Sequence, residues 1–412
     1  MTAPLRSLLV GAAVCLASVV VTSGRLDNAA FLKQLDLLAN NATLQRLLAE
    51  QWPPQERLLK ANQFPCQALN ASSVTPTSVH SLRPADIRVV GSLGDSLTAG
   101  NGISATNIFA VLVQNRGLSW SGGGQGTFET TVTMPNVLKK FNPNLYGYAT
   151  GDGDEDSSRS YFNVAITGST SSELESQARK LINRIRGDSK VDFNNDWKVV
   201  TILSGNNDLC DVCNDRDKYS ADRYRANLIA ALNILQAELP RTLVNLVEPI
   251  NIEIVTELNK GLICSLLHLY LCDCAAFPKN KEAEEELIHI RGEYQQVVRD
   301  IAASGMFDTR DDFTVVYQPF FKDTYPPDQD GHPDYSFFAP DCFHLSAKAQ
   351  QAASIALWNN MIEPVPMKKT KWLPGEPVEC PTEEQPFIYT NKNSFRQSSA
   401  AMTGLEESST VL

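Results

Sequence analysis

The sequence contains few basic residues relative to its acidic ones, which limits the partners that it can bind. Its 412 residues include 36 Lys and Arg against 47 Asp and Glu, so the net charge is −11. Binding to nucleic acid needs clustered cations against the phosphates, and so does a strong electrostatic hold on an anionic membrane. The charge balance therefore excludes a general nucleic-acid-binding protein. With 43% hydrophobic and 20% charged residues, the composition indicates a globular protein.

Long hydrophobic runs are also scarce, and the clearest one, over 8–21, lies close to the N-terminus. A basic residue before it and small residues after it predict a signal peptide over 1–24, although an uncleaved anchor would differ mainly in length. The run is shorter than a membrane span, and the polar tail over 366–412 lacks the hydrophobic end of a lipid-anchor signal. We therefore expect a secreted, extracellular protein with no transmembrane span in the mature chain. Two Asn-x-Ser/Thr triplets, at Asn41 and Asn70, are candidate glycosylation sites and agree with this route.

The chain has nine cysteines, of which only Cys15 falls within the predicted signal peptide. An even number of cysteines in a secreted protein predicts disulfide bonds, whose pairing the sequence leaves open. For the same reason we interpret Cys210 and Cys213 as cysteines that form disulfides rather than as a redox or zinc motif. The remaining eight cysteines are Cys66, Cys210, Cys213, Cys264, Cys272, Cys274, Cys342 and Cys380.

Short apolar runs alternate along the chain with segments of helical periodicity. Strands that alternate with helices are typical of an α/β domain with a mostly parallel sheet and helices on both faces. We therefore predict a three-layer α/β domain over 86–365. The runs predict strands over 87–91, 161–166, 199–203, 243–247 and 313–317, and the periodic segments predict helices over 172–185, 219–239, 282–304 and 346–362.

Three other segments lie outside this alternation. An N-terminal extension over 25–85 combines a helical pattern over 28–50 with a proline-containing loop. A polar C-terminal tail occupies 366–412. The stretch over 114–160 is long and rich in Gly, Asn and Ser, and long irregular insertions are often functional. A lid over a binding site is one hypothesis for this insertion.

The first candidate for chemistry is Ser96, in the sequence Gly94-Asp95-Ser96-Leu97. It follows a predicted strand directly and precedes a short helical segment. Ligands of open α/β sheets bind at the carboxyl ends of the strands, and the N-terminal end of a helix favours a developing anion. A serine in this position is suited to act as a nucleophile. The alternative is an ordinary N-cap residue.

A serine nucleophile needs a general base, and the chain has only five histidines. His344 precedes a predicted helix, and Asp341 lies three residues before it. On a loop, this spacing lets the carboxylate accept a hydrogen bond from the imidazole and fix its tautomer, although Asp341 could instead cap the helix. A rival pair is His332 with Asp334. Structural or surface roles fit the other histidines better, namely His80, His268, His289 and His332.

Two further segments follow predicted strands and offer hydrogen-bond donors. The segment 204–208 contains asparagines, and an asparagine at the end of a strand can donate its side-chain N–H₂ to a developing oxyanion. The alternative is an ordinary turn. In the segment 163–169, Gly168 lets its backbone N–H approach a ligand closely.

Two other patterns lack residues that ligand-binding motifs need. The glycine-rich stretch over 122–126 has no Walker lysine. The acidic stretch over 152–156 begins like a calcium loop, but Ser157 stands where that loop has Gly, and Asn163 stands where it has Glu. We therefore expect no metal and no cofactor.

Taken in order, the blocks around Ser96, 163–169, 204–208 and 337–344 resemble the signature blocks of the SGNH, or GDSL, hydrolases, which have a flavodoxin-like fold. The sequence is also similar to a single catalytic repeat of animal membrane-associated phospholipase B over roughly residues 30 to 390. The segments that carry this similarity are 117–121, 136–143, 207–210, 312–316 and 337–344.

The resemblance implies a role for each matching residue. Ser96 would be the nucleophile, His344 its base, and Asp341 the residue that orients the base. The backbone N–H groups of Ser96 and Gly168 and the side chain of Asn207 would form the oxyanion hole. The implied reaction is metal-free hydrolysis of phospholipid and lysophospholipid esters through an acyl-enzyme, at a lipid–water interface.

Two other functions remain open from the sequence. The same fold and chemistry could serve other lipid, short-chain or acyl-sugar esters, because acyl specificity depends on the shape of the pocket. A non-catalytic lipid- or protein-binding protein is the third possibility, and it would be recognised by the loss of a residue of the triad. The sequence leaves the oligomeric state and the preference for acyl position open.

Overall fold

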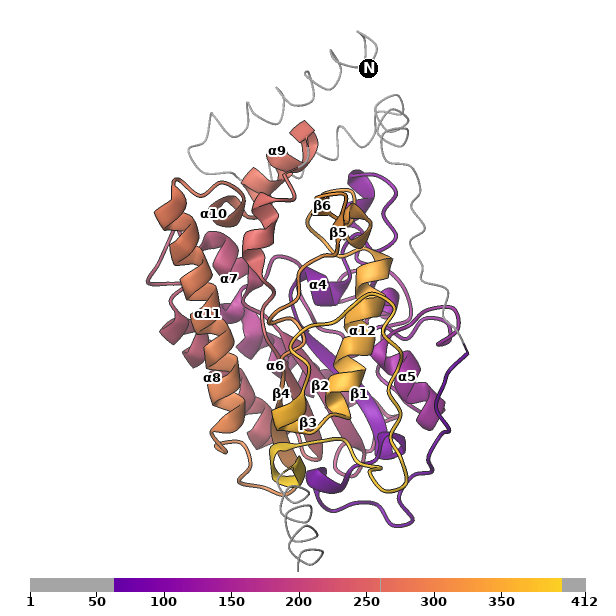
Figure 1. The fold of residues 1–412 in the computed structure, drawn as a ribbon. Helices are drawn as coiled ribbons and strands as arrows, with labels where there is room; N and C mark the ends of the chain where they lie inside the picture. The colour runs from indigo at the N-terminus through magenta and orange to yellow at the C-terminus, as the bar shows by residue number, and fades with distance from the viewer. Residues whose placement is uncertain (1–62, 260, 395–412) are drawn as a thin grey trace, which may run out of the picture.

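A sheet of four parallel strands forms the centre of the protein (Figure 1). The computed structural model describes residues 63–259 and 261–394. The structure confirms four of the five predicted strands, and their carboxyl ends lie along one edge of the sheet because all four are parallel. In their order across the sheet they are β1 (Ile87–Gly94), β2 (Trp197–Leu203), β3 (Thr242–Val247) and β4 (Phe313–Gln318).

Helices cover both faces of this sheet, which explains why the strands are apolar runs without alternation. Successive strand residues point to opposite faces. Val90 lies in the hydrophobic cluster with α5 and α12, whereas its neighbour Val89 lies in the cluster with α6, α8 and α11. The four predicted helices are confirmed as α6, α8, α11 and α12. The bounds of these helices are α5 (Met134–Phe141), α6 (Leu174–Gly187), α8 (Ala221–Glu238), α11 (Lys281–Ala303) and α12 (Ala347–Met361).

Polar side chains begin several of the helices. Oxygens of Thr133, Ser220 and Asn280 accept a backbone N–H in the first turns of α5, α8 and α11. The shorter α-helices and the two-stranded hairpin are α4 (Ser96–Ala99), α7 (Asn206–Asp211), α9 (Gly261–Leu271), α10 (Asp273–Ala276), β5 (Asp328–Gln329) and β6 (His332–Pro333). The 3₁₀ helices are η1 (Val79–Ser81), η2 (Pro84–Asp86), η3 (Phe109–Leu112), η4 (Arg116–Leu118), η5 (Ser171–Glu173), η6 (Ile252–Thr256), η7 (Tyr335–Phe337) and η8 (Val365–Met367).

The strand predicted over 161–166 is wrong. The segment lies parallel to β1 at the edge of the sheet and exchanges backbone hydrogen bonds with Ser92 and Gly94, but the pairing amounts to an isolated bridge between Ser92 and Asn163 rather than a strand. Tyr161 has a φ of 45°, a left-handed conformation that interrupts an extended backbone. The apolar run therefore correctly predicts that the segment is buried beside β1. The backbone conformation at Tyr161 prevents it from forming a regular strand.

Arg116 holds this edge segment from its outer side. Its guanidinium is fully buried and donates to the backbone oxygens of Gly153, Asn163 and Ala165 at 2.8, 3.0 and 2.7 Å. It also donates to Oε1 of Gln114 at 2.5 Å. Burial lowers the pKa of Arg116 to about 10, so the group stays charged at neutral pH. The arginine thus satisfies carbonyl groups that a further strand would otherwise have bound.

The insertion over 114–160 packs into the domain, which contradicts the lid hypothesis. Trp120 is fully buried in the cluster that contains α12, and its backbone N–H donates to Oε1 of Gln350 at 2.9 Å. The N–H of Val90 in β1 donates to the Tyr146 oxygen at 2.9 Å. The stretch also contains α5, whose apolar side covers the sheet. It is therefore part of the hydrophobic core.

All eight cysteines of the described residues form disulfides, as the sequence predicts. Cys210 and Cys213 belong to two different bonds, which confirms that they are not a redox or zinc pair. One bond joins the loop before α12 to α9, and another joins the first and last parts of the described chain. The pairs are Cys66–Cys380, Cys210–Cys272, Cys213–Cys274 and Cys264–Cys342.

The segments on either side of the predicted domain pack against it. Leu82 and Ile388 are fully buried in one cluster, and the Ile388 N–H donates to the Leu82 oxygen at 2.8 Å. The predicted signal peptide, the helical pattern over 28–50 and Asn41 lie outside the described residues. Asn70 is exposed. Its glycosylation stays a prediction.

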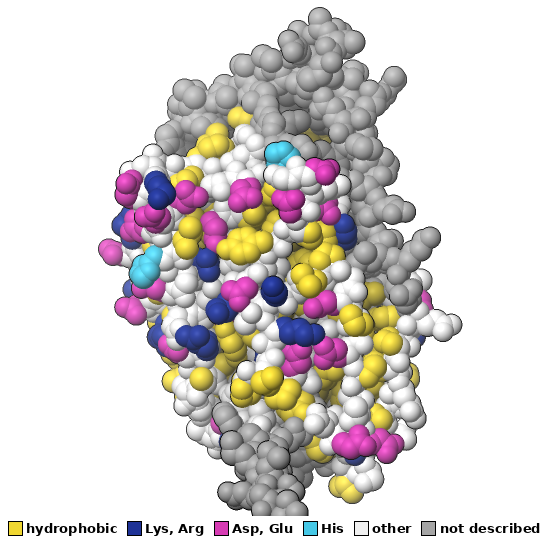
Figure 2. Space-filling model, in the orientation of Figure 1, with side chains coloured by type: hydrophobic (Ala, Val, Ile, Leu, Met, Phe, Trp, Pro, Cys, Tyr) yellow, Lys and Arg dark blue, Asp and Glu magenta, His cyan; other side chains and the backbone are white. Residues whose placement is uncertain are grey.

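The described surface carries charges of both signs. Figure 2 shows Lys and Arg interspersed with Asp and Glu on one face, with hydrophobic side chains between them. Within residues 63–259 and 261–394, no helix is both long enough and apolar enough to cross a membrane. Large hydrophobic side chains that are exposed include Leu112, Val113, Leu269 and Phe277.

Replacing Arg116 with methionine tests whether the buried guanidinium holds the edge of the sheet. Methionine keeps much of the apolar volume but leaves several buried carbonyl groups without a donor, at a cost of about 1–3 kcal/mol each. We expect the free energy of unfolding, measured by urea denaturation under non-reducing conditions, to fall by ~3 kcal/mol or more. Arg223→Met, on the exposed side of α8, should change it by less than about 0.5 kcal/mol. An equally small change in Arg116→Met would contradict this role.

Candidate active site

Ser96 lies at the carboxyl end of β1, as the first residue of α4. A Cβ at Gly94 would lie 2.4 Å from the Leu203 oxygen, so only glycine fits where the chain turns out of the sheet. Asp95 then caps α4, because its Oδ1 accepts the Leu97 N–H at 2.9 Å. Ser96 is 5% exposed. The sequence Gly-Asp-Ser thus builds a sharp strand-to-helix turn with the serine at the start of the helix.

Two other loops meet this turn. The Ser169 hydroxyl donates to the Gly94 oxygen at 2.9 Å, which places the loop that contains Gly168 beside β1. Nδ2 of Asn207 in turn donates to the Ser169 oxygen at 2.9 Å. The structure therefore brings Ser96, Gly168 and Asn207 to the same corner of the sheet edge.

The donors at this corner leave room for a ligand. No group of the described residues accepts a hydrogen bond from the backbone N–H of Ser96 or from that of Gly168. Gly168 has a φ of +75°, and a Cβ there would meet nothing within 4 Å. Asn207 uses its amide for Ser169, and an amide nitrogen carries a second N–H. Such a set of donors is suited to stabilise an oxyanion.

Asp341 and His344 form a buried pair on the loop before α12. Nδ1 of His344 donates to Oδ2 of Asp341 at 2.5 Å, and the two side chains are 7% and 2% exposed. The backbone N–H groups of Phe343 and His344 donate to the other carboxylate oxygen at 3.1 Å. Burial alone would raise the pKa of Asp341, but the His344 charge and these donors hold it below its usual value. The carboxylate therefore stays ionised and keeps the imidazole in one tautomer.

Side chains from α12 and the insertion hold this loop next to Ser96. Gln350, in the second turn of α12, donates to the Leu97 oxygen at 3.2 Å and accepts the Trp120 N–H at 2.9 Å. His344 also lies close enough to Asp95 to lower its pKa, which burial raises overall. Hydrogen bonds thus join α12, the helix that follows the loop of His344, to the turn that carries Ser96.

The sequence did not predict a pair of buried hydrogen bonds beneath the turn that carries Ser96. Oδ2 of Asp95 accepts a hydrogen bond from Nδ2 of Asn206 at 2.9 Å, and the Asn206 amide oxygen accepts the Ile250 N–H at 3.1 Å. Both side chains are buried. The link joins the ends of β1, β2 and β3. The only signal in the sequence was that polar residues follow two apolar runs directly.

The other histidines have the structural or surface surroundings that the sequence predicts. His289 is 75% exposed on α11, and His332 is exposed in β6. Asp334, the carboxylate of the rival pair, binds Lys348 at 2.9 Å. His268 is fully buried in α9.

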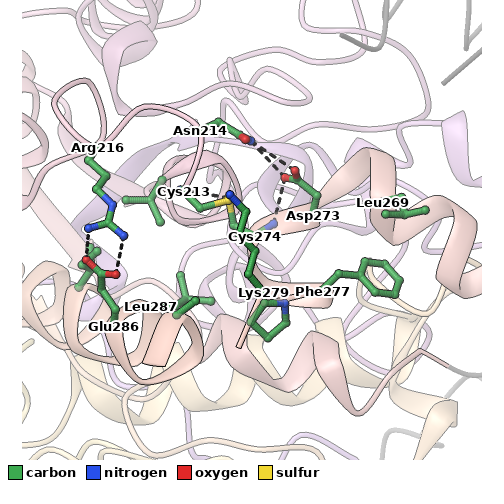
Figure 3. A pocket seen from close by; sticks show the side chains of 14 residues that line it. Cys213, Asn214, Arg216, Leu269, Asp273, Cys274, Phe277, Lys279, Glu286 and Leu287 are labelled. Carbon is green, nitrogen blue, oxygen red and sulfur yellow. Dashed lines mark hydrogen bonds and ion pairs between the residues drawn. A yellow bond between two sulfur atoms is a disulfide. The ribbon is translucent and has the colours of Figure 1, made fainter. Parts of the chain in front are cut away.

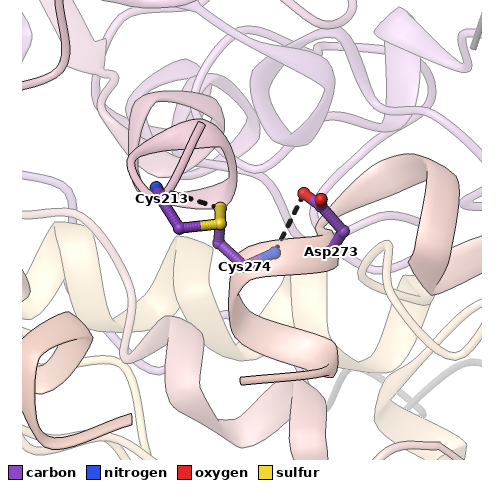
Figure 4. Close-up of side chains that lie close together, drawn as sticks. All are labelled: Cys213, Asp273 and Cys274. Carbon is purple, nitrogen blue, oxygen red and sulfur yellow. Dashed lines mark hydrogen bonds between the residues drawn. A yellow bond between two sulfur atoms is a disulfide. The ribbon is translucent and has the colours of Figure 1, made fainter. Parts of the chain in front are cut away.

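Two groups of side chains of the kind that bind metals form bonds within the chain. Cys213, Asp273 and Cys274 lie close together, but Figure 4 shows that the two sulfur atoms are bonded to each other, so only the carboxylate remains. In the acidic stretch over 152–156, Asp156 forms an ion pair with Lys180 at 2.7 Å. Neither arrangement leaves a set of ligands for a metal.

A pocket of about 250 Å³ lies beside the Cys213–Cys274 disulfide, between α10 and α11 (Figure 3). The polar groups on its wall pair with each other, since Arg216 binds Glu286 and Asn214 donates to Asp273 at 3.2 Å. Leu269 and Phe277 complete its apolar side. It contains none of the predicted site residues.

Comparison with protein families agrees with the fold. A model described as GDSL-like lipase/acylhydrolase matches residues 90–357. The chain therefore belongs to the GDSL-like lipase/acylhydrolase family. The resemblance that the sequence blocks indicate is confirmed.

The most informative relatives are phospholipases. The chain is 44% identical over 354 residues to human membrane-associated phospholipase B1, and 43% identical over 347 residues to the mouse protein. These matches cover 83% and 82% of the chain but 24% of each relative, so the chain spans about a quarter of the length of the curated relatives it matches. This is consistent with one repeat.

Two solved structures are also similar to the chain. A GDSL-like lipase from Parabacteroides merdae is 18% identical, with 65% of this chain and 92% of that chain covered and a TM-score of 0.33. An acetyl xylan esterase from Geobacillus stearothermophilus is 16% identical with the same coverage and a TM-score of 0.30.

Glu248 is a buried acid at the same edge of the sheet, directly after β3. It is 1% exposed, and the Tyr317 hydroxyl donates to its Oε1. Its Oε2 has no hydrogen-bond partner among the described residues. Burial raises the pKa of Glu248 to about 8, in spite of the tyrosine donor. The side chain is therefore protonated in the folded protein at neutral pH.

Replacing Glu248 with glutamine tests this protonation state. The folded protein keeps the proton to about pH 8, whereas the unfolded chain releases it near 4.5, so folding is progressively less favourable as the pH rises between these values. Glutamine does not titrate, so this dependence of stability on pH is absent from Glu248→Gln. We expect the stability of Glu248→Gln relative to the unsubstituted protein to rise by up to about 1.4 kcal/mol per pH unit in that window, measured by urea denaturation at several pH values. If the difference in stability between Glu248→Gln and the unsubstituted protein does not change with pH, Glu248 is already ionised in the folded protein.

Proposed function

We propose that this protein is a secreted, phospholipase B-like serine esterase that hydrolyses acyl ester bonds of phospholipids and lysophospholipids. The observation that carries the proposal is the 2.5 Å hydrogen bond from His344 to Asp341, on the loop before α12, whose Gln350 donates to the Leu97 oxygen directly after Ser96. A histidine whose Nδ1–H is fixed by a carboxylate has its Nε2 free to accept a proton. A serine at the start of a helix, beside such a histidine, fits nucleophilic acyl transfer.

The reaction has two halves. Ser96 Oγ attacks the ester carbonyl carbon while Nε2 of His344 takes the hydroxyl proton; the bond to the alcohol oxygen then breaks, and His344 returns the proton to that oxygen. Water next attacks the acyl-enzyme, with His344 again as base, and the fatty acid leaves as Ser96 regains its proton. Asp341 remains ionised throughout and stabilises the imidazolium.

Three donors stabilise the negative oxygen that forms in each half. They are the backbone N–H groups of Ser96 and Gly168 and the amide of Asn207. The two backbone groups have no acceptor among the described residues, so they need not break a bond to receive the oxyanion. Preorganised donors of this kind contribute more in a site that excludes water than in solution. The buried surroundings of Ser96 fit that requirement.

Two observations support a lipid substrate. The relatives that match most of the chain are named phospholipase B1. In addition, the segment after α4 exposes Leu112 and Val113, and its buried neighbour Val111 packs against Ala339 in the loop of His344. An apolar surface continuous with the site suits substrates that are presented at a lipid–water interface. The disulfides fit the oxidising, extracellular compartment of a secreted protein.

Replacing Ser96 with alanine should abolish hydrolysis, because the nucleophile is lost while the fold is kept. We expect no turnover above background on micellar lysophospholipid or on a short soluble ester, with an unchanged melting temperature. Ser158→Ala, an exposed serine in the insertion, should behave like the unsubstituted protein. Retained turnover in a folded Ser96→Ala protein would exclude Ser96 as the nucleophile.

Replacing Asn207 with alanine removes one donor for the oxyanion. We expect kcat to fall by about 10²–10³-fold with a much smaller change in KM, since the amide acts in the transition state. Steady-state kinetics on a soluble ester separate the two parameters. Asn194→Ala, an exposed asparagine before β2, is the matched control. Equal losses in kcat and in substrate affinity would point to a structural role for Asn207.

A further inference from the structure

His268 reaches from α9 to the main chain of Asp341. Its ring is fully buried, and Nε2 lies 3.1 Å from the Asp341 backbone oxygen. Its Nδ1 lies 2.7 Å from Oδ1 of Asn259. Nδ2 of Asn259 donates to the Ala276 oxygen at 2.8 Å, which fixes the amide so that its oxygen faces the histidine. Both nitrogens of His268 therefore face acceptors.

We propose that His268 is a positioning residue, which holds the Asp341 backbone so that the carboxylate faces His344. The inference rests on the proposed function, because it assigns His268 a part in the same reaction. His268 does not touch the reacting atoms. It acts through Asp341, whose side chain binds His344 at 2.5 Å while its carbonyl accepts from His268.

Two other contacts join α9 to this loop. Cys264 lies one helical turn before His268 and forms a disulfide with Cys342. The Phe343 ring packs against the imidazole, with ring centroids 6.0 Å apart. Three consecutive residues of the loop, Asp341, Cys342 and Phe343, thus contact α9. Cys342 has a φ of 59°, a conformation that residues with side chains adopt only when their surroundings impose it.

The number of protons on His268 decides how many of these hydrogen bonds form. A neutral imidazole has one N–H and can satisfy only one of two acceptors, whereas the imidazolium satisfies both. Burial lowers the pKa of His268, and the nearby His344 lowers it further, while the Asp341 carboxylate and the backbone of Asp341 and Cys342 raise it.

These contacts give two variants with different expected effects. Glutamine keeps one N–H donor near the position of Nε2 but never carries a charge. His268→Gln should retain kcat within about threefold, because one net hydrogen bond is preserved. Phenylalanine keeps the ring but donates nothing, so His268→Phe should lower kcat by about tenfold to 10²-fold at nearly constant KM, as expected for a displaced catalytic group.

The split between kcat and KM separates positioning from simple destabilisation. A displaced Asp341 lowers kcat at nearly constant KM and is rescued by the N–H donor of His268→Gln, whereas destabilisation lowers the melting temperature of both variants. Steady-state kinetics on a short soluble ester between pH 5 and 8, together with melting temperatures, measure these effects. His289→Gln, at an exposed histidine on α11, is the matched control and should leave both kcat and KM unchanged.

The outcomes distinguish this inference from the proposed function. If Ser96→Ala retains hydrolysis, the proposed function fails, and the role of His268 fails with it. If Ser96→Ala is inactive but a folded His268→Phe protein keeps its kcat, only the role of His268 is overturned. If His268→Phe does not fold, His268→Gln decides: a folded protein whose kcat falls more than about tenfold overturns the inference, and a retained kcat and KM support it.

Discussion

The hydrogen bond between Asp95 and Asn206 is the interaction on which the carboxyl edge of the sheet depends. It joins the turn after β1 to the turn after β2, and both side chains are buried. A buried polar group that loses its partner is costly, so neither turn can move without the other. The bonds from Ser169 to Gly94 and from Asn207 to Ser169 add the third loop. The corner that holds the proposed nucleophile is thus fixed by polar contacts beneath it.

The proposed base, His344, is held in place by a different set of contacts. Its loop is held by the disulfide from Cys264 to Cys342 and by the contact of His268 with Asp341, and the helix that follows it, α12, is joined to Leu97 through Gln350. These partners come from α12 and α9, which are far apart in the sequence. The nucleophile therefore depends on the sheet, whereas the histidine depends on two helices. Small shifts of either helix would change the distance between them without unfolding the sheet.

The sequence predicts the features that depend on residues close together in the chain. Four strands were found because each is a continuous apolar run, and four helices because each carries a helical hydrophobic period. The Asp341–His344 pair was found because its partners are three residues apart. The strand over 161–166 failed because its apolar run does not show the backbone conformation. Tyr161 has a left-handed φ, and the Gly94 N–H donates to Gln177 of α6 instead of to this segment.

The sequence could not predict the contacts between segments that are far apart in the chain. The even number of cysteines predicted disulfides, but the pairing followed only from the packing of α7, α9 and α10. His268 looked like a core histidine in an apolar helix, and its partner Asp341 could not be read from spacing. The insertion over 114–160 has the composition of a loop, yet Trp120 and α5 place it in the core.

Mapping the adduct of a fluorophosphonate probe by peptide mass spectrometry tests the central claim most directly. These probes react with serines that a neighbouring base activates, and they need no knowledge of the natural ester. If Ser96 is the activated serine, the adduct is confined to the peptide that contains Ser96, and His344→Ala abolishes it. An adduct on another serine, or an unmodified protein under conditions in which it is folded, would contradict the claim.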